Sequence, residues 1–96
     1  MKYNKQMDFE WDAGKAFVNL RKHHVRFEDA ARVFLDPYRI EIYDGRDGED
    51  RWKTVGMVEP ALLIVVYTVR GKNHDVIRLI SARKADAHER TRYRET

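Results

Sequence analysis

Apolar residues in the N-terminal quarter of the chain recur at the spacing of an α-helix. Four of them fall at positions i, i+3, i+4 and i+7: Ala13, Ala16, Phe17 and Leu20. This periodicity predicts a helix over residues 13–23 that buries these four side chains. Asp12 directly precedes the stripe, and its carboxylate can accept hydrogen bonds from the unpaired N–H groups of a first helical turn. We therefore expect the helix to begin after Asp12.

The same spacing returns in the next segment, with alanines between two phenylalanines: Phe27, Ala30, Ala31 and Phe34. It predicts a second helix from about Val25 to about Leu35, whose small side chains suit close packing against a sheet. Asp36-Pro37 should end this helix, because the residue before a proline avoids helical backbone angles.

Most of the remaining chain is patterned as β-strands. We expect a short strand at residues 9–11, an alternating strand at 38–43, and two further strands at 52–58 and 76–82. Residues 61–70 contain the run Leu-Leu-Ile-Val-Val-Tyr, which is typical of a central strand covered on both faces.

A final helix is indicated by Asp86-x-x-Glu89, which resembles a capping box and is followed by several arginines. The predicted order of elements is β-α-α-β-β-β-β-α. This order favours an α+β fold with an antiparallel β-sheet, two N-terminal helices and one C-terminal helix.

The length of 96 residues suits one domain with a modest core. We expect residues 7–96 to form that domain and residues 1–6 to be a frayed extension, or Met7 to be the natural start. The chain has no cysteine, which excludes disulfides and thiolate zinc sites. No segment is long and apolar enough to span a bilayer, and no signal-peptide pattern opens the chain, so we expect a cytoplasmic protein with no membrane contact.

Positive charge is concentrated toward the C-terminus. The net charge is +3, but residues 1–68 hold 11 Lys and Arg against 12 Asp and Glu, whereas residues 69–96 hold 8 against 4. This asymmetry is expected if one face binds a polyanion, although a solvated charged surface explains the composition equally simply.

A second stripe of the first helix is mostly cationic: Lys15, Asn19, Lys22 and His23. Further cations, tyrosines and one acid follow in the second half of the chain: Tyr67, Arg70, Arg78, Arg83, Lys84, Glu89, Arg90 and Tyr93. Such a set can cleave RNA without a metal ion. The 2′-hydroxyl of the substrate attacks the adjacent phosphorus, side chains move the protons, and cations stabilise the charge on the phosphoryl oxygens.

Each candidate also has a structural explanation. His23 can titrate near neutral pH, but a cation at a helix C-terminus also interacts favourably with the helix dipole. Arg83 and Lys84 stand beside a predicted helix N-terminus, which attracts anions, yet pairing of Arg83 with Glu89 or Asp86 is an equal alternative. The tyrosines can stack on bases or close the rim of the core.

A metal centre is poorly supported. The acidic loop at residues 44–50 misses calcium-loop spacing, because Arg46 stands where an oxygen ligand is required. A glycine-rich phosphate loop and a nucleophile elbow are also missing from the sequence. We therefore expect neither a metal nor a cofactor.

Two segments carry a family resemblance. The first contains Phe9-Glu10-Trp11-Asp12, then Lys15, Asn19 and Lys22-His23; the second contains Ile77-Arg78, Ser81-Ala82-Arg83-Lys84, Glu89-Arg90 and Tyr93. Between them, Asp36-Pro37, Gly56 and Val65-Val66-Tyr67 stand in the same order. Over roughly residues 7–94, this ordered set resembles the BrnT family, the small ribonuclease toxins of bacterial type II toxin–antitoxin modules.

The resemblance implies a RelE-like fold and a toxic endoribonuclease that inhibits translation and arrests growth in the bacterial cytoplasm. It implies a cognate BrnA-like antitoxin with a ribbon-helix-helix DNA-binding part, contact with operator DNA only through that antitoxin, and a dimer-containing toxin–antitoxin complex. Matched to this sequence, the resemblance supplies recurrent polar positions: Lys15, Lys22, His23, Tyr67, Arg78, Arg83 and Glu89. Among them we expect Lys15, His23 and Arg83 to be catalytic, with His23 as proton carrier, Arg83 on the phosphoryl oxygens and Lys15 as second cation or base. The RNA-binding set is then Lys22, Tyr67, Arg70, Arg78, Lys84, Glu89, Arg90 and Tyr93.

Other readings remain open. The chain can be a non-catalytic module that binds RNA or antitoxin, or a subunit of a DNA-bound autorepressor complex whose basic end touches phosphates. The intact polar set argues against a degenerate module, because packing alone does not require those residues.

Overall fold

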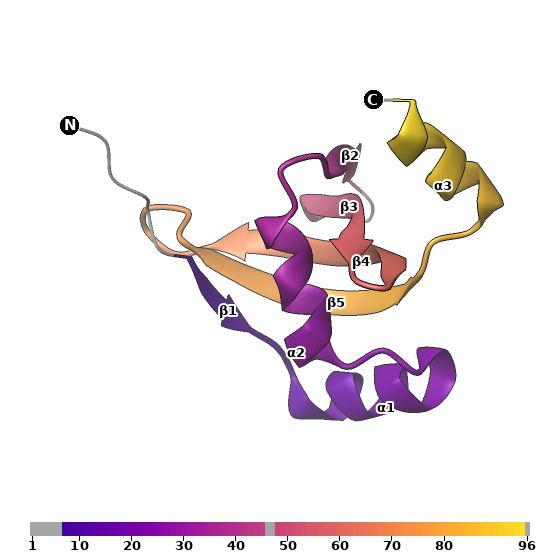
Figure 1. Ribbon diagram of the computed structural model, residues 1–96. Helices are drawn as coiled ribbons and strands as arrows, with labels where there is room; N and C mark the ends of the chain where they lie inside the picture. Colours follow the sequence, from indigo (N-terminus) through magenta and orange to yellow (C-terminus); the bar gives the residue numbers. More distant parts are fainter. Residues whose placement is uncertain (1–6, 46–47, 96) are drawn as a thin grey trace.

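A five-stranded sheet forms the centre of the computed structural model, which describes residues 7–45 and 48–95. The strands are β1 (Asp8–Glu10), β2 (Ile40–Asp44), β3 (Arg51–Val58), β4 (Ala61–Arg70) and β5 (Val76–Lys84). Their order in the sheet is β1-β5-β4-β3-β2. All neighbouring pairs are antiparallel except β1 and β5, which run parallel. The expected α+β fold and element order are confirmed (Figure 1).

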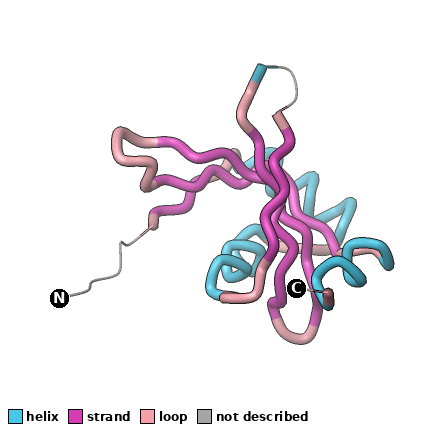
Figure 2. Tube along the Cα trace, turned by 90° about the horizontal axis from the view of Figure 1, so that it is seen from above, coloured by secondary structure: helices cyan, strands magenta, loops and turns pink. Residues whose placement is uncertain are grey.

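The central position of β4 follows from its composition. Leu63, Val65 and Tyr67 point into one core cluster, while Leu62 and Ile64 point into a second cluster on the opposite face. Alternation along a strand sends neighbouring side chains to opposite faces, so an unbroken apolar run requires cover on both. Figure 2 shows, from above, the strands running through the middle of the molecule with helical segments at their sides.

The second predicted helix is present but divided. It begins as α2 (Phe27–Ala30) and tightens into the 3₁₀ helix η1 (Ala31–Leu35) before Asp36 takes an extended conformation. Phe27 and Val33 are almost wholly buried against the sheet. The close approach depends on Gly56 of β3, because a Cβ there would lie only 2.7 Å from Val33 Cγ2.

The first helix, α1 (Ala13–His23), begins as predicted, with Asp12 Oδ2 accepting from Lys15 N at 2.9 Å. The predicted buried stripe is wrong for Ala13, Phe17 and Leu20, which are exposed, whereas Ala16 is partly buried against the first core cluster. Phe17 and Leu20 are 60% and 42% exposed, and the buried residue of this helix is Asn19. The reason is position: α1 lies beside β5 (Figure 1), past the segment that pairs with β1, and there Asn19 bonds the backbone N–H and C=O of Ala82.

The last helix, α3 (Ala87–Arg94), opens on the predicted capping box. Asp86 Oδ1 accepts from Glu89 N and Glu89 Oε1 accepts from Asp86 N, both at 2.8 Å. Tyr93 of α3 packs on the second core cluster and donates its hydroxyl to Asp36 Oδ2 at 2.7 Å. This bond ties the C-terminal helix to the turn after η1 and raises the pKa of Tyr93 to about 12.

Some expectations concern boundaries. The last strand continues two residues beyond the predicted end, so Arg83 and Lys84 both belong to β5. The proposed extension at residues 1–6 lies outside the described residues. Within residues 7–45 and 48–95, no helix has the length and apolar composition needed to cross a bilayer.

Candidate active site

A cavity of about 500 Å³ lies between α1 and β5. The cationic stripe predicted from helical spacing lines one wall, since Lys15, Lys22 and His23 all border the cavity. Ile80 and Ser81 of β5 border it from the strand. Spacing along one helix therefore does bring three of the predicted polar residues to a common space.

Asn19 fixes the distance between the two walls. Its Nδ2 donates to the carbonyl oxygens of Val25 and Ala82, at 3.0 and 2.8 Å, and its Oδ1 accepts from Ala82 N at 3.0 Å. The carboxamide thus satisfies both backbone groups of Ala82 and one of the chain segment after α1. The sequence placed Asn19 on the polar stripe, but its spacing alone could not identify it as the anchor of α1.

In the described part of the chain, the two lysines of the cavity are not in ion pairs, although the Asp12 carboxylate that caps α1 also borders the cavity. Among residues 7–45 and 48–95, the ion pairs involve other basic residues, and neither Lys15 nor Lys22 takes part in one. His23 is half-buried in the last turn of α1. It therefore occupies the position that the helix dipole favours for a cation, and it also borders the cavity.

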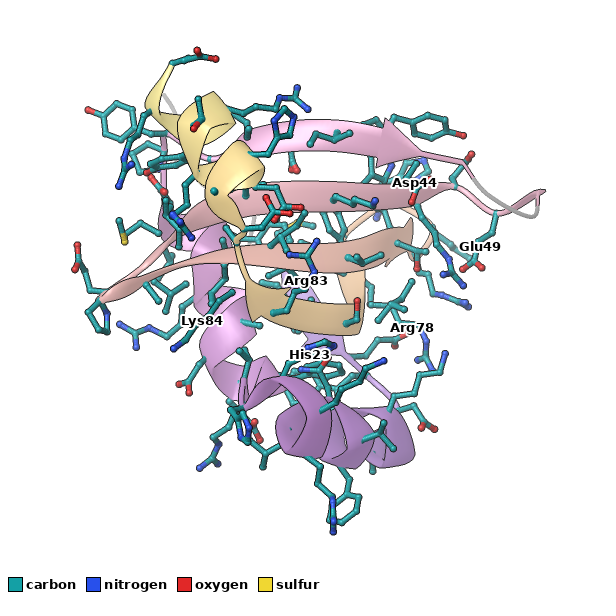
Figure 3. All side chains as sticks on the ribbon, turned by 90° about the vertical axis from the view of Figure 1, so that its right-hand side faces the viewer. His23, Asp44, Glu49, Arg78, Arg83 and Lys84 are labelled. Carbon is teal, nitrogen blue, oxygen red and sulfur yellow. The ribbon has the colours of Figure 1, made fainter. Side chains whose placement is uncertain are left out.

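Arg83 lies on β5 two residues beyond Ser81, so the two residues share a face of the strand. A register shift between β4 and β5 lies between Leu79 and Ser81, and therefore Ser81 and Arg83 are not on the face where Leu79 enters the core. At about 3.3 Å of rise per residue, two residues on one face of a strand are about 7 Å apart. Figure 3 shows His23 and Arg83 on the same face of the molecule. Arg83 does not line the cavity itself, although Ser81, two residues before it on β5, does.

The guanidinium of Arg83 is already paired. Its two terminal nitrogens donate to the two carboxylate oxygens of Glu89, each at 2.8 Å, and Nη1 also donates to the carbonyl oxygen of Lys84 at 3.1 Å. The hydrogen bonds from Arg83 lower the pKa of Glu89 despite its burial, and the same carboxylate raises the pKa of Arg83. The pairing with Glu89, one of the two alternatives, is the one observed.

The N-terminus of α3 is consequently not a vacant anion site. Asp86 and Glu89 already place two carboxylates on its first N–H groups and on Arg83. We expected this helix end to attract a phosphate, but the protein's own carboxylates occupy that position.

Two predicted RNA-binding tyrosines are engaged elsewhere. Tyr67 is only 7% exposed, and its hydroxyl donates to the Glu41 carboxylate at 2.8 Å. Burial and this bond raise its pKa. It cannot stack on a base from that position, so we do not retain it in the RNA-binding set. Tyr93 is committed to Asp36 and closes the second core cluster.

The remaining predicted cations are dispersed. Arg78 pairs with Glu10 of β1 at 3.0 Å, and Arg90 donates to the carbonyl oxygen of Ala85 at 2.9 Å. Lys84 lines a different cavity, because it follows Arg83 on the strand and therefore points to the opposite face. Arg70 ends β4 at the hairpin with β5, the end of the sheet away from α3 (Figure 1).

The chemistry available in the cavity is that of proton transfer beside fixed positive charge. One imidazole and two ammonium groups converge on a space that can admit a phosphodiester. Within the described part of the chain, groups of three or more His, Cys, Asp or Glu that could hold a metal ion do not occur.

Comparison with known proteins gave a family match and a structural match. A family model described as "Ribonuclease toxin, BrnT, of type II toxin-antitoxin system" matches residues 11–89. The crystal structure of the Brucella abortus ribonuclease toxin BrnT is similar to this fold, with a TM-score of 0.69 and 24% sequence identity over 84% of this chain and 99% of that chain. The search of curated proteins returned no match.

Proposed function

Because this chain belongs to the BrnT family of ribonuclease toxins of type II toxin–antitoxin systems, we propose that it cleaves RNA without a metal ion in the cavity between α1 and β5. One observation carries the proposal: Lys15, Lys22 and His23 border the same cavity, and the two lysines have no carboxylate partner among the described residues. A cation without a carboxylate partner can direct all its donors and its full charge to a phosphate, whereas the carboxylate of a pair offsets part of that charge.

The proposed step is attack by the substrate's own 2′-hydroxyl. The neutral imidazole of His23 takes the 2′ proton, the 2′-oxygen bonds to phosphorus, and the bond from phosphorus to the 5′-oxygen breaks. The Lys15 ammonium gives a proton to the departing 5′-oxygen, and Lys22 holds a phosphoryl oxygen. The products are a 2′,3′-cyclic phosphate and a 5′-hydroxyl. DNA, which lacks the nucleophile, is spared.

Arg83 is proposed to contact the phosphoryl group from the rim while it stays paired. A guanidinium has five N–H donors, and the contacts to Glu89 and the Lys84 carbonyl use three of them. Two donors remain for a phosphate oxygen. Glu89 then acts as the residue that orients Arg83, rather than as a direct RNA ligand.

The adjacent histidines His23 and His24 provide a matched test. His23 borders the cavity, whereas His24 lines a different one and has a left-handed backbone with φ of 61°. Asparagine tolerates that conformation, so His23→Asn and His24→Asn make comparable changes. We expect His23→Asn to slow RNA cleavage by about 10²–10⁴-fold, the usual contribution of a general acid or base, and His24→Asn to have little effect.

The assay should use purified toxin, RNA with one cleavable linkage and an excess of chelator, and should identify the ends of the products. Cyclic phosphate ends that persist in chelator support the proposal. Equal loss in the two variants, or activity that chelator removes, would refute it. If the protein cuts no RNA and arrests no growth when induced alone, the alternative of a non-catalytic binding module in an autorepressor complex replaces it.

A toxin of a type II system has a protein antitoxin as its partner. We propose that this partner is BrnA-like, with a ribbon-helix-helix part that binds operator DNA on behalf of a dimer-containing complex, and that the toxin acts in the bacterial cytoplasm. All ionisable side chains of α1 are basic, which suits an acidic partner. Size measurement of the co-purified complex and its operator binding, with and without the toxin, test this assembly.

A further inference from the structure

The outward face of α1 is apolar, although the helix is amphipathic. Phe17, Val18 and Leu20 are 60%, 59% and 42% exposed. They share one broad arc of the helix, because residues 17, 18, 20 and 21 lie within about half a turn of each other at 100° per residue. Isolated exposed apolar residues are common on protein surfaces, whereas several together on one element mark an interaction surface.

Shape adds to this observation. Phe17, Leu20 and Arg21 form a ridge along α1. Beside this ridge, a groove of about 310 Å³ is bordered by Phe17, Leu20 and the buried Phe27. On the other flank, Val18 borders the cavity that holds Lys15, Lys22 and His23. The groove is apolar apart from the paired Arg26 and Glu28, so a partner laid across α1 would fill it and reach the proposed active site.

Charge indicates what kind of partner fits. Residues 13–23 include Lys15, Arg21, Lys22 and His23 but no acidic residue. The Arg21 guanidinium lies over the Phe17 ring, 5.6 Å from its centroid, so positive charge reaches into the apolar ridge itself. The complementary surface has bulky apolar side chains flanked by Asp or Glu.

We propose that this ridge, made of Phe17, Leu20 and Arg21, is the docking surface for an acidic, amphipathic segment of the antitoxin. Apolar side chains of that segment occupy the groove, and its carboxylates reach Lys22 and Lys15 and close the cavity to RNA. The inference rests on the proposed function for the identity of the partner. It adds the surface that is bound and explains why α1 keeps its apolar stripe in solvent.

The test compares two polar variants. In the first, Phe17→Ser and Leu20→Ser are combined. In the second, Leu35→Ser serves as a matched control, because Leu35 is 80% exposed but lies at the end of η1. The binding probe is the purified product of the short reading frame adjacent to the toxin gene. Its affinity for each toxin variant, RNA cleavage by each variant alone and the size of each free toxin are measured.

We expect the double variant to bind this product at least about tenfold more weakly, which is the range of a central apolar contact, while it cleaves RNA at the wild-type rate. The Leu35→Ser control should match the wild type in both assays. Unchanged affinity of the double variant overturns the inference alone. If the double variant loses RNA cleavage but keeps its affinity, the ridge is an RNA surface and the inference is also overturned. The same holds if the free wild-type toxin is a dimer and the double variant is a monomer, because the ridge is then a self-association surface. If the neighbouring product does not bind even the wild-type toxin, the proposed partner fails and the docking surface fails with it.

Discussion

Removal of the Asn19 carboxamide should weaken the whole fold, although the residue lies on a helix with an otherwise exposed face. Asn19 is 5% exposed and makes three hydrogen bonds to backbone groups of Val25 and Ala82. At about 1 kcal/mol net for each hydrogen bond, we expect Asn19→Ala to lower the free energy of unfolding by about 3 kcal/mol. For a domain of this size that corresponds to a fall in Tm of roughly 12–24 °C.

The measurement is urea and thermal unfolding followed by circular dichroism, with Phe17→Ala as the control on the exposed face of the same helix. Asn19→Asp adds a sharper comparison, because it retains the shape and the acceptor for Ala82 N but turns a carboxylate toward two carbonyl oxygens. It should therefore be less stable than Asn19→Ala at neutral pH. A change below about 0.5 kcal/mol for Asn19→Ala, the level of an ordinary surface substitution, would refute the view that this side chain holds α1 on β5.

Two further predictions concern residues on the two strands that flank β4, Arg83 of β5 and Gly56 of β3. Arg83 lowers the pKa of Glu89 in the folded protein, so this pair should stabilise the fold above the ordinary pKa of about 4.5 and lose that contribution as the pH falls through the lowered value. The free energy of unfolding measured from pH 2 to 7 should therefore depend less on pH in Glu89→Gln than in the wild type. Equal slopes in the two proteins would contradict the pairing. A methyl group at position 56 would meet Val33 Cγ2 at 2.7 Å and Arg39 Cβ at 3.0 Å. Gly56→Ala should therefore lower the free energy of unfolding by about 1–3 kcal/mol in the same denaturation assay. A neutral effect would mean that η1 can move away from β3.

Local chemistry made much of the fold predictable. Asp12 and the Asp86–Glu89 capping box act within one helical turn, so the sequence contains both partners of each contact. The apolar run of β4 is similarly informative, because only a strand covered on both faces tolerates it. The ends of these elements were therefore placed within a few residues of those observed.

Contacts between distant segments were not predictable in the same way. Periodicity showed that Phe17 and Leu20 share a face, but it did not show that this face points to solvent. The partner of Tyr67 is Glu41, 26 positions away on β2, and no spacing rule connects them. The cavity was foreseen in part because Lys15, Lys22 and His23 stand on one helix, whereas the relation of Arg83 to it depends on how β5 lies beside that helix.

The placement of Asn19 has a consequence for the behaviour of the protein at high concentration. β1 pairs with β5 only from Val76 to Arg78, and an unpaired strand edge is a template on which further chains can add. The side chain of Asn19 occupies both hydrogen-bonding groups of Ala82, beyond the point where β1 ends. The Asn19 side chain thereby withholds both groups of Ala82 from pairing with the edge of another chain.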